Sequence, residues 1–230
     1  MIEAIFHWHS FVELQYDWWT ILIDPFITWN PSCDCTVEDC LKKNITHILI
    51  THGHWDHIGD TLALARQNES IQIITVYGIS KWLETEAIKN VHGFGIGGTY
   101  SDAIVSVKFY TAIHDGAILE TGISTQPAWL LISLSWKNIY HAWDSALTLD
   151  FWLLKNKHID VAFLPIGWTY TMDVDDAIEA VALMNPKIAV PIHYNTRPKL
   201  KADDQRFARE IMTQNLAVPK VLRPWQAVVL

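Results

Sequence analysis

The sequence has no uninterrupted apolar run close to the roughly 20 residues that a membrane-spanning helix needs, although half of its 230 residues are hydrophobic. Residues 1–4 contain no lysine or arginine, so we expect no secretory signal peptide. Cysteine is scarce, with Cys33, Cys35 and Cys40 as the complete set. An odd number of cysteines without a secretory signal is typical of reduced thiols, so we predict a cytoplasmic protein with no membrane partner.

The three cysteines are close in the sequence but lack the usual spacing of a structural zinc site. The pattern Cys-x-Cys-x4-Cys contains no Cys-x2-Cys pair. We therefore interpret these residues as ordinary loop thiols, with a soft-metal site as the alternative.

Basic residues are also fewer than acidic ones. Lysine and arginine number 17 against 25 acidic residues, which gives a formal net charge of −8. Because binding to a phosphate backbone requires a basic surface, this balance weighs against a nucleic-acid partner. The predicted partner is a small-molecule substrate, and assembly into a homo-oligomer is left open.

Residues 51–60 carry a dense group of metal-ligating residue types, namely His52, His54, Asp56 and His57. An apolar, β-branched stretch precedes them, and Asp60 stands in the N-cap position of a helical stretch that follows. Imidazole suits zinc and similar first-row ions, and a carboxylate adds a charged oxygen. The spacing favours two ions, because the first two histidines can face one way and the Asp–His pair another. The alternative is a surface histidine cluster, which needs no strand–loop–helix setting.

The pattern His-x-His-x-Asp-His after a strand resembles the metallo-β-lactamase fold superfamily. The resemblance covers nearly the whole chain. Within the superfamily, the chain is similar to one branch, the UPF0173-type metal-dependent hydrolases, which are related to lactonase-like members. It rests on residues 21–26, 90–93, 96–98, 139–142, 165–167, 171–173 and 191–196. The resemblance implies an α/β protein with an αββα sandwich, built as a single metallo-β-lactamase-like domain over residues 1–230.

The resemblance also implies a dinuclear site. His52, His54 and His114 would bind one metal ion, whereas Asp56, His57 and His193 would bind the other. Asp144 would bridge the two ions, and Asp56 and Asp144 are the predicted catalytic residues. Five further residues are expected behind the ligands or in the pocket: His9, Asp24, Trp55, Trp168 and Asn195. For His9, an ordinary turn histidine is an equal alternative.

The implied function is a metal-dependent hydrolase that uses a metal-bridging hydroxide on an ester, lactone or related small substrate. The cofactors are two divalent ions, for which zinc is the first choice and manganese and iron are alternatives. A phosphodiesterase or nuclease-like hydrolase is the competing activity. The sequence leaves the substrate, the oligomeric state and the activity of this chain undecided.

The chain contains twelve tryptophans, and most of them stand where the resemblance leads us to expect glycine. Glycine in such loops usually provides a positive φ or a close backbone approach, which strains a tryptophan. Three explanations compete: the positions are altered or misread, their backbone is ordinary, or the rings line an aromatic pocket. A metal-binding protein with little turnover is therefore a further alternative. The positions are Trp8, Trp29, Trp55, Trp129, Trp136, Trp143, Trp168 and Trp225, with Trp18 or Trp19.

Hydrophobic periodicity predicts alternating strands and helices after residue 44, as in an α/β layer fold. Asp173 is the predicted N-cap of a helix over residues 174–184. We also expect a helix over residues 147–155 and a surface helix over residues 203–214. Residues 93–98 are glycine-rich and predict turns rather than a phosphate-binding loop, because no Lys-Ser or Lys-Thr follows.

Overall fold

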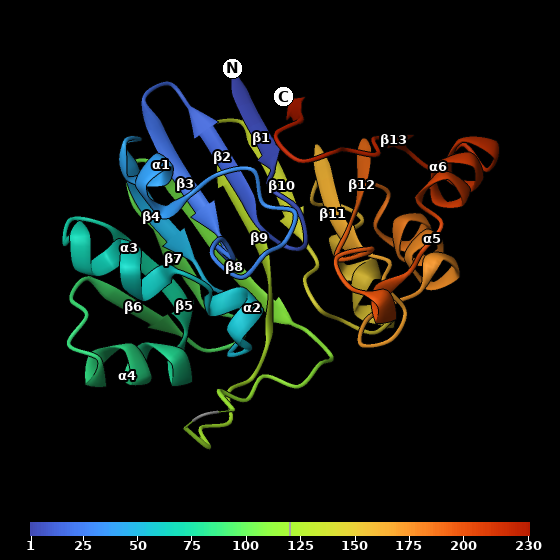
Figure 1. Ribbon diagram of the computed structural model, residues 1–230. Coiled ribbons are helices and arrows are strands. Elements are labelled where there is room, and N and C mark those ends of the chain that lie inside the picture. The colour runs from blue at the N-terminus through green and yellow to red at the C-terminus, as the bar shows by residue number, and fades with distance from the viewer. Residues whose placement is uncertain (120) are drawn as a thin grey trace. The chain divides into compact units, whose positions relative to one another are not determined.

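The computed structural model describes residues 1–119 and 121–230 and contains two seven-stranded sheets (Figure 1). Helices connect several of the strands along the chain. The chain forms two compact units. The first comprises residues 1–100, 115–128 and 223–230, and the second comprises residues 101–114 and 129–222. Whether residues 1–230 act as a single domain stays a prediction.

The first sheet has the strand order β14-β1-β2-β3-β4-β5-β6. Its first three sequential strands form an antiparallel meander, and β3 to β6 run parallel. The bounds are β1 Ile2–Phe6, β2 Val12–Tyr16, β3 Trp19–Ile23, β4 Ile45–Leu49, β5 Gln72–Val76, β6 Val91–Phe94 and β14 Ala227–Val229. The helices of this unit are α1 Val37–Leu41, α2 Trp55–Ile58, α3 Thr61–Gln67 and α4 Tyr77–Thr85.

The second sheet has the strand order β13-β12-β11-β10-β9-β8-β7. Strands β10 to β13 are parallel, and β9 pairs with β10 in an antiparallel hairpin. The strands are β7 Thr99–Ser101, β8 Val105–Thr111, β9 Ala128–Leu134, β10 Lys137–His141, β11 Val161–Pro165, β12 Ile188–Ile192 and β13 Val218–Pro219. The helices are the 3-10 segments η1 Leu149–Leu154 and η2 Pro198–Leu200, with α5 Val174–Met184 and α6 Asp204–Thr213.

Local sequence explains where these elements form. In β8, Val105, Val107 and Phe109 are buried and alternate with more exposed residues, the period of a half-buried strand. Central β11 is buried along its whole length, as expected for a parallel strand covered on both faces. The side chain of Asp173 accepts a hydrogen bond from the Asp176 backbone N–H at 2.9 Å, which caps α5 as predicted.

Two sequence expectations need correction. The segment expected to be helical over residues 147–155 forms a shorter 3-10 helix, η1. Asp60 occupies the N-cap position of α3, but its carboxylate makes no capping hydrogen bond. It accepts instead from the backbone N–H groups of Ile27 and Thr28 at 2.9 and 2.8 Å, so it fixes the loop after β3.

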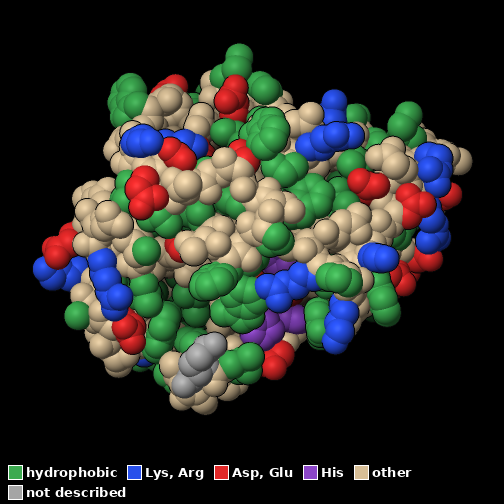
Figure 2. Space-filling model, in the orientation of Figure 1, with side chains coloured by type: hydrophobic (Ala, Val, Ile, Leu, Met, Phe, Trp, Pro, Cys, Tyr) green, Lys and Arg blue, Asp and Glu red, His purple; other side chains and the backbone are tan. Residues whose placement is uncertain are grey.

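The exposed side chains show no broad region of one charge on the face drawn in Figure 2, where basic groups lie among acidic ones. Many hydrophobic side chains also reach this surface. The exposed ones include Trp18, Trp29, Trp136 and Trp225. Among the residues described, no helix is long and apolar enough to cross a membrane.

Candidate metal centre

The loop after β4 is held by a buried carboxylate at the end of β3. Asp24 accepts a hydrogen bond from the Thr51 backbone N–H at 3.1 Å and one from the Thr51 hydroxyl at 2.6 Å. Because β3 and β4 are adjacent parallel strands, their carboxyl ends meet at one edge of the sheet. The loop that carries the histidines therefore starts from a fixed point. The sequence did not predict this role of Thr51, because a threonine before a histidine is an ordinary strand-end residue.

Asp24 also orients His57, which lies on the short helix α2. The Nδ1–H group of His57 donates to Asp24 Oδ2, and both side chains are fully buried. Burial raises the pKa of Asp24 to about 6, although His57 and Thr51 oppose that shift. A carboxylate behind one ring nitrogen fixes the tautomer of a histidine, so Nε2 carries the lone pair that a metal ion requires.

His52 and His54 lie close together at the beginning of the loop. His52 Nε2 and His54 Nδ1 are 3.0 Å apart, and the other nitrogen of His52 is 3.1 Å from the Thr51 hydroxyl. The ring centroids of His52 and His57 are 4.0 Å apart. Converging imidazole nitrogens with a nearby carboxylate form a donor set that zinc, manganese and iron accept, so these residues fit a metal ion.

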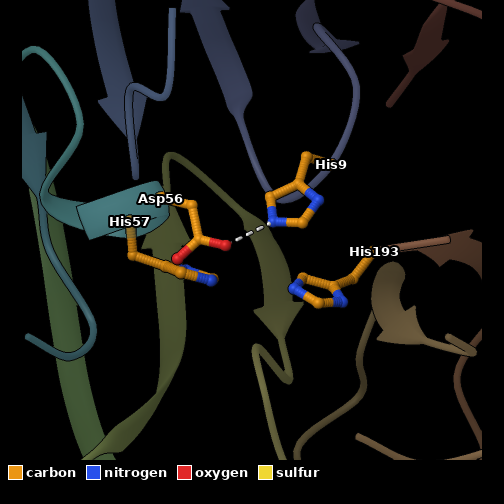
Figure 3. Close-up of side chains that lie close together, drawn as sticks. All are labelled: His9, Asp56, His57 and His193. Atoms are coloured by element: carbon orange, nitrogen blue, oxygen red, sulfur yellow. Dashed lines mark hydrogen bonds and ion pairs between the residues drawn. The ribbon is translucent and has the colours of Figure 1, made fainter. Parts of the chain in front are cut away.

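Asp56 follows in the first turn of α2 and contacts a histidine from the turn after β1. His9 Nε2 lies 3.1 Å from Asp56 Oδ2, and the dashed line in Figure 3 marks this pair. His9 is 1% exposed and packs edge-on against Phe26. The α2 helix ends at Gly59, whose φ is +51° and where a Cβ would stand 2.3 Å from the Pro25 carbonyl oxygen. Glycine is thus required where the loop turns back from the ligands.

In the second unit, Asp144 lies between two histidines. His114 follows β8, Asp144 follows β10 and His193 follows β12. Asp144 Oδ2 is 3.5 Å from His114 Nε2, and Asp144 Oδ1 is 3.1 Å from His193 Nε2. The hydrogen bond from the Ala146 N–H to the Ile113 carbonyl, at 3.0 Å, joins the two loops. The two carboxylate oxygens of one aspartate therefore face two different predicted ligands.

The remaining predicted site residues have less specific surroundings. Asn195 has a φ of +55° and bonds the backbone of Ala202 through both its amide oxygen and its amide nitrogen, a loop-closing role. Trp55 is 38% exposed and packs edge-on against Phe26. Trp168 is 58% exposed. That either ring lines a pocket stays a prediction.

Four tryptophans have the left-handed backbone that normally belongs to glycine. We call them the positive-φ tryptophans; their φ angles lie between +51° and +79°, and they are Trp8, Trp143, Trp168 and Trp225. A bulky residue rarely adopts this conformation, which costs roughly 1–2 kcal/mol. The other tryptophans that the sequence analysis singled out have no positive φ, so their backbone is ordinary in this respect.

Trp143 combines the positive φ with burial beside a predicted ligand. It immediately precedes Asp144, is 1% exposed, and stacks on His141 with ring centroids 3.7 Å apart. Its indole nitrogen is buried without a hydrogen-bond partner among the residues described. A buried N–H without a partner costs about 1–3 kcal/mol, so this position is unfavourable for tryptophan in two ways.

Comparisons with known proteins identify the family of the chain. The family model described as the beta-lactamase superfamily domain matches residues 19–194. A UPF0173 metal-dependent hydrolase from Enterococcus faecalis is 40% identical, and the match covers 99% of both chains. Another from Lysinibacillus sphaericus is 38% identical, over 95% of this chain and 96% of the relative. Igni18, a metallo hydrolase from Ignicoccus hospitalis, is 31% identical with a TM-score of 0.89, over 99% of this chain and 97% of its own. These matches confirm the predicted fold class. The chain belongs to the beta-lactamase superfamily and, within it, to the UPF0173 family of metal-dependent hydrolases.

Proposed function

We propose that the chain is a dinuclear hydrolase of esters, lactones or related small substrates, with zinc as the metal. The proposed ligands are His52, His54 and His114 for one ion, Asp56, His57 and His193 for the other, and Asp144 for both. A homo-oligomer and a small-molecule substrate belong to the same proposal.

The observation that carries the two-ion proposal is the position of Asp144. One of its oxygens faces His114 at 3.5 Å and the other faces His193 at 3.1 Å. A carboxylate that bridges two ions must direct its two oxygens toward the two different groups of ligands, as the Asp144 carboxylate does for His114 and His193.

The chemistry that two bound ions supply is a lower pKa of water and polarisation of a carbonyl or phosphoryl oxygen. The residues of the chain contribute proton handling. Asp56 is the proposed general base, and its Oδ2 atom contacts His9 Nε2 at 3.1 Å. The His9 contact orients this carboxylate, and a proton accepted at Asp56 could later pass to the leaving group. Asp24 keeps His57 in one tautomer throughout, so that ligand does not compete for the proton.

Metal content and hydrolysis test this function together. We would compare the parent chain with Asp144→Asn and with Asp160→Asn, a buried carboxylate elsewhere in the second unit. We expect the parent chain to bind about two ions and to hydrolyse a lactone or an aryl ester. Of the two variants, only Asp144→Asn should lose these ions, and its activity should fall at least 100-fold. Unchanged metal content in folded Asp144→Asn would refute the dinuclear assignment. Cleavage of bis(p-nitrophenyl) phosphate but no lactone or ester would favour the phosphodiesterase alternative.

A second candidate function is metal binding with little turnover, and Trp143 favours it. Its buried ring and strained backbone stand immediately before Asp144. Under this alternative, the parent chain binds its ions without hydrolysis, and Trp143→Gly restores activity with no change in metal content. Activity in the parent chain that Trp143→Gly does not raise would exclude it.

A further inference from the structure

A second group of metal-ligating side chains lies in the first unit, around Cys35. Its sulfur is 3.7 Å from Cys33 Sγ, 3.8 Å from Cys40 Sγ and 3.8 Å from His7 Nδ1. Cys33 and Cys35 lie in the loop before α1, Cys40 lies on that helix, and His7 follows β1. None of these residues belongs to the proposed dinuclear site.

The distances exclude a disulfide and place Cys33, Cys40 and His7 around the Cys35 sulfur. The ligand atoms of His7, Asp34 and Cys35 all lie within 4.8 Å of one another. With a zinc–sulfur bond of about 2.3 Å, two ligand sulfurs in a tetrahedron are roughly 3.8 Å apart. The two sulfur pairs that include Cys35 have this spacing, at 3.7 and 3.8 Å. A disulfide requires about 2.05 Å, so all three cysteines are free thiols. Thiolate ligands select zinc over hard ions.

His7 has the surroundings of a metal-binding histidine. Its Nε2 atom lies 3.0 Å from Glu13 Oε2, and Glu13 is fully buried and paired with the Lys43 ammonium at 2.6 Å. A carboxylate behind one nitrogen leaves the other nitrogen, Nδ1, directed toward the ligand position. That atom faces Cys35 and also Asp34, whose Oδ1 lies 2.7 Å away. Binding of an ion at Nδ1 would displace Asp34.

The cluster is also closed in the way that structural zinc sites are. Cys40 is fully buried and His7 is 3% exposed, whereas Cys33 and Cys35 are half-buried. Four protein ligands leave no open position for substrate. An ion here would tie the loop before α1 to the turn after β1, in which the His7 N–H donates to the Phe11 carbonyl at 3.0 Å.

We propose that Cys33, Cys35, Cys40 and His7 bind one structural zinc ion. The site is separate from the dinuclear centre, but it fixes the turn that carries His9, the partner of Asp56. The short Cys-x-Cys-x4-Cys spacing does not predict this site, because the fourth proposed ligand lies far upstream in the sequence. The meander of β1, β2 and β3 places the end of β1 on the same side of the sheet as the end of β3.

Cobalt substitution tests this site without any measurement of activity. The reduced, metal-free chain is titrated with Co²⁺, and thiolate-to-cobalt charge transfer is followed in the near ultraviolet. The expected result is a thiolate band that saturates at one ion per chain, disappears in Cys35→Ser, and persists in Asp34→Asn and Asp144→Asn. The last variant separates this proposal from the dinuclear one, because it removes the other ions only.

X-ray absorption at the zinc edge provides a measurement on the parent chain, which does not depend on the folding of a variant. Sulfur scattering at about 2.3 Å is expected, and it should remain when the chain carries Asp144→Asn. Absence of a thiolate band and of sulfur scattering in the fully reduced parent chain would overturn the proposal. A band that persists in Cys35→Ser but disappears in Asp34→Asn would overturn it as well.

Discussion

Replacement of Trp225 by glycine should stabilise the protein, which is the reverse of what glycine substitutions usually do. Trp225 has a φ of +59° and a side chain that is 68% exposed. Its backbone N–H donates to the Phe6 carbonyl at 2.8 Å, and glycine retains that hydrogen bond. The substitution therefore relieves backbone strain and removes little packing.

The magnitude follows from two opposing contributions. A left-handed backbone costs a residue with a Cβ roughly 1–2 kcal/mol, and glycine avoids this. Glycine adds freedom to the unfolded chain, which costs about 0.4–1 kcal/mol of stability. The net gain for Trp225→Gly is thus about 0–1.6 kcal/mol, and the centres of the two ranges give about 0.8 kcal/mol. Trp136 is a matched control, because it is 71% exposed in a turn but has no positive φ. Trp136→Gly should lose about 0.5–1 kcal/mol.

Thermal and urea unfolding of both variants beside the parent chain measure this difference. For a chain of this length, 1 kcal/mol shifts the melting temperature by about 2–4 °C, so the variants should melt several degrees apart, on opposite sides of the parent. If Trp225→Gly were destabilised as much as Trp136→Gly, the positive φ would not be a source of strain and the argument would fail for all the positive-φ tryptophans.

Three further predictions concern other positions. Gly167→Ala should lower metal content and activity, because the new Cβ would stand 2.2 Å from the His193 carbonyl oxygen. Gly95→Ala is the control and should change neither, because the space around Gly95 is open. Equal effects of the two substitutions would contradict this prediction. Burial raises the pKa of Asp160, but hydrogen bonds from Lys187 and from the Asn138 backbone lower it below its usual value. The ionised Asp160 therefore stabilises the fold above pH 3.8, the usual pKa of an aspartate, and this stabilisation is lost as the pH falls below that value. Asp160→Asn should therefore cost about 1–2 kcal/mol at pH 7 and less near pH 3 in urea titrations, and a constant difference would refute the linkage. Peptide mass spectrometry of the protein from its native source should find glycine at the positive-φ tryptophans; tryptophan-containing peptides there would show that the chain tolerates the strain.

Local sequence predicted the regular elements well, because their signals lie within a few residues. Asp173 and the apolar period after it determine α5 without help from the rest of the chain. The histidine loop was predictable for the same reason, since its residue types are contiguous and follow a strand. Asp60 shows the limit of such reasoning. It occupies the predicted N-cap position, but the loop after β3 offers two backbone N–H groups, and tertiary contacts decide where its carboxylate bonds.

The features that the sequence concealed depend on residues distant along the chain. His7 lies far from the cysteines in the sequence, so their spacing alone could not predict its contact with Cys35. The tryptophans present the converse case. Their residue type alone signalled a conflict, but only the backbone separates the strained positions, such as Trp143 and Trp225, from ordinary ones such as Trp136. A residue that contradicts its backbone at several unrelated loops is hard to explain by selection for one aromatic pocket. The positive-φ tryptophans share a conformation and not a location in the sequence, so the conformation, which is glycine's, is the property that requires an explanation.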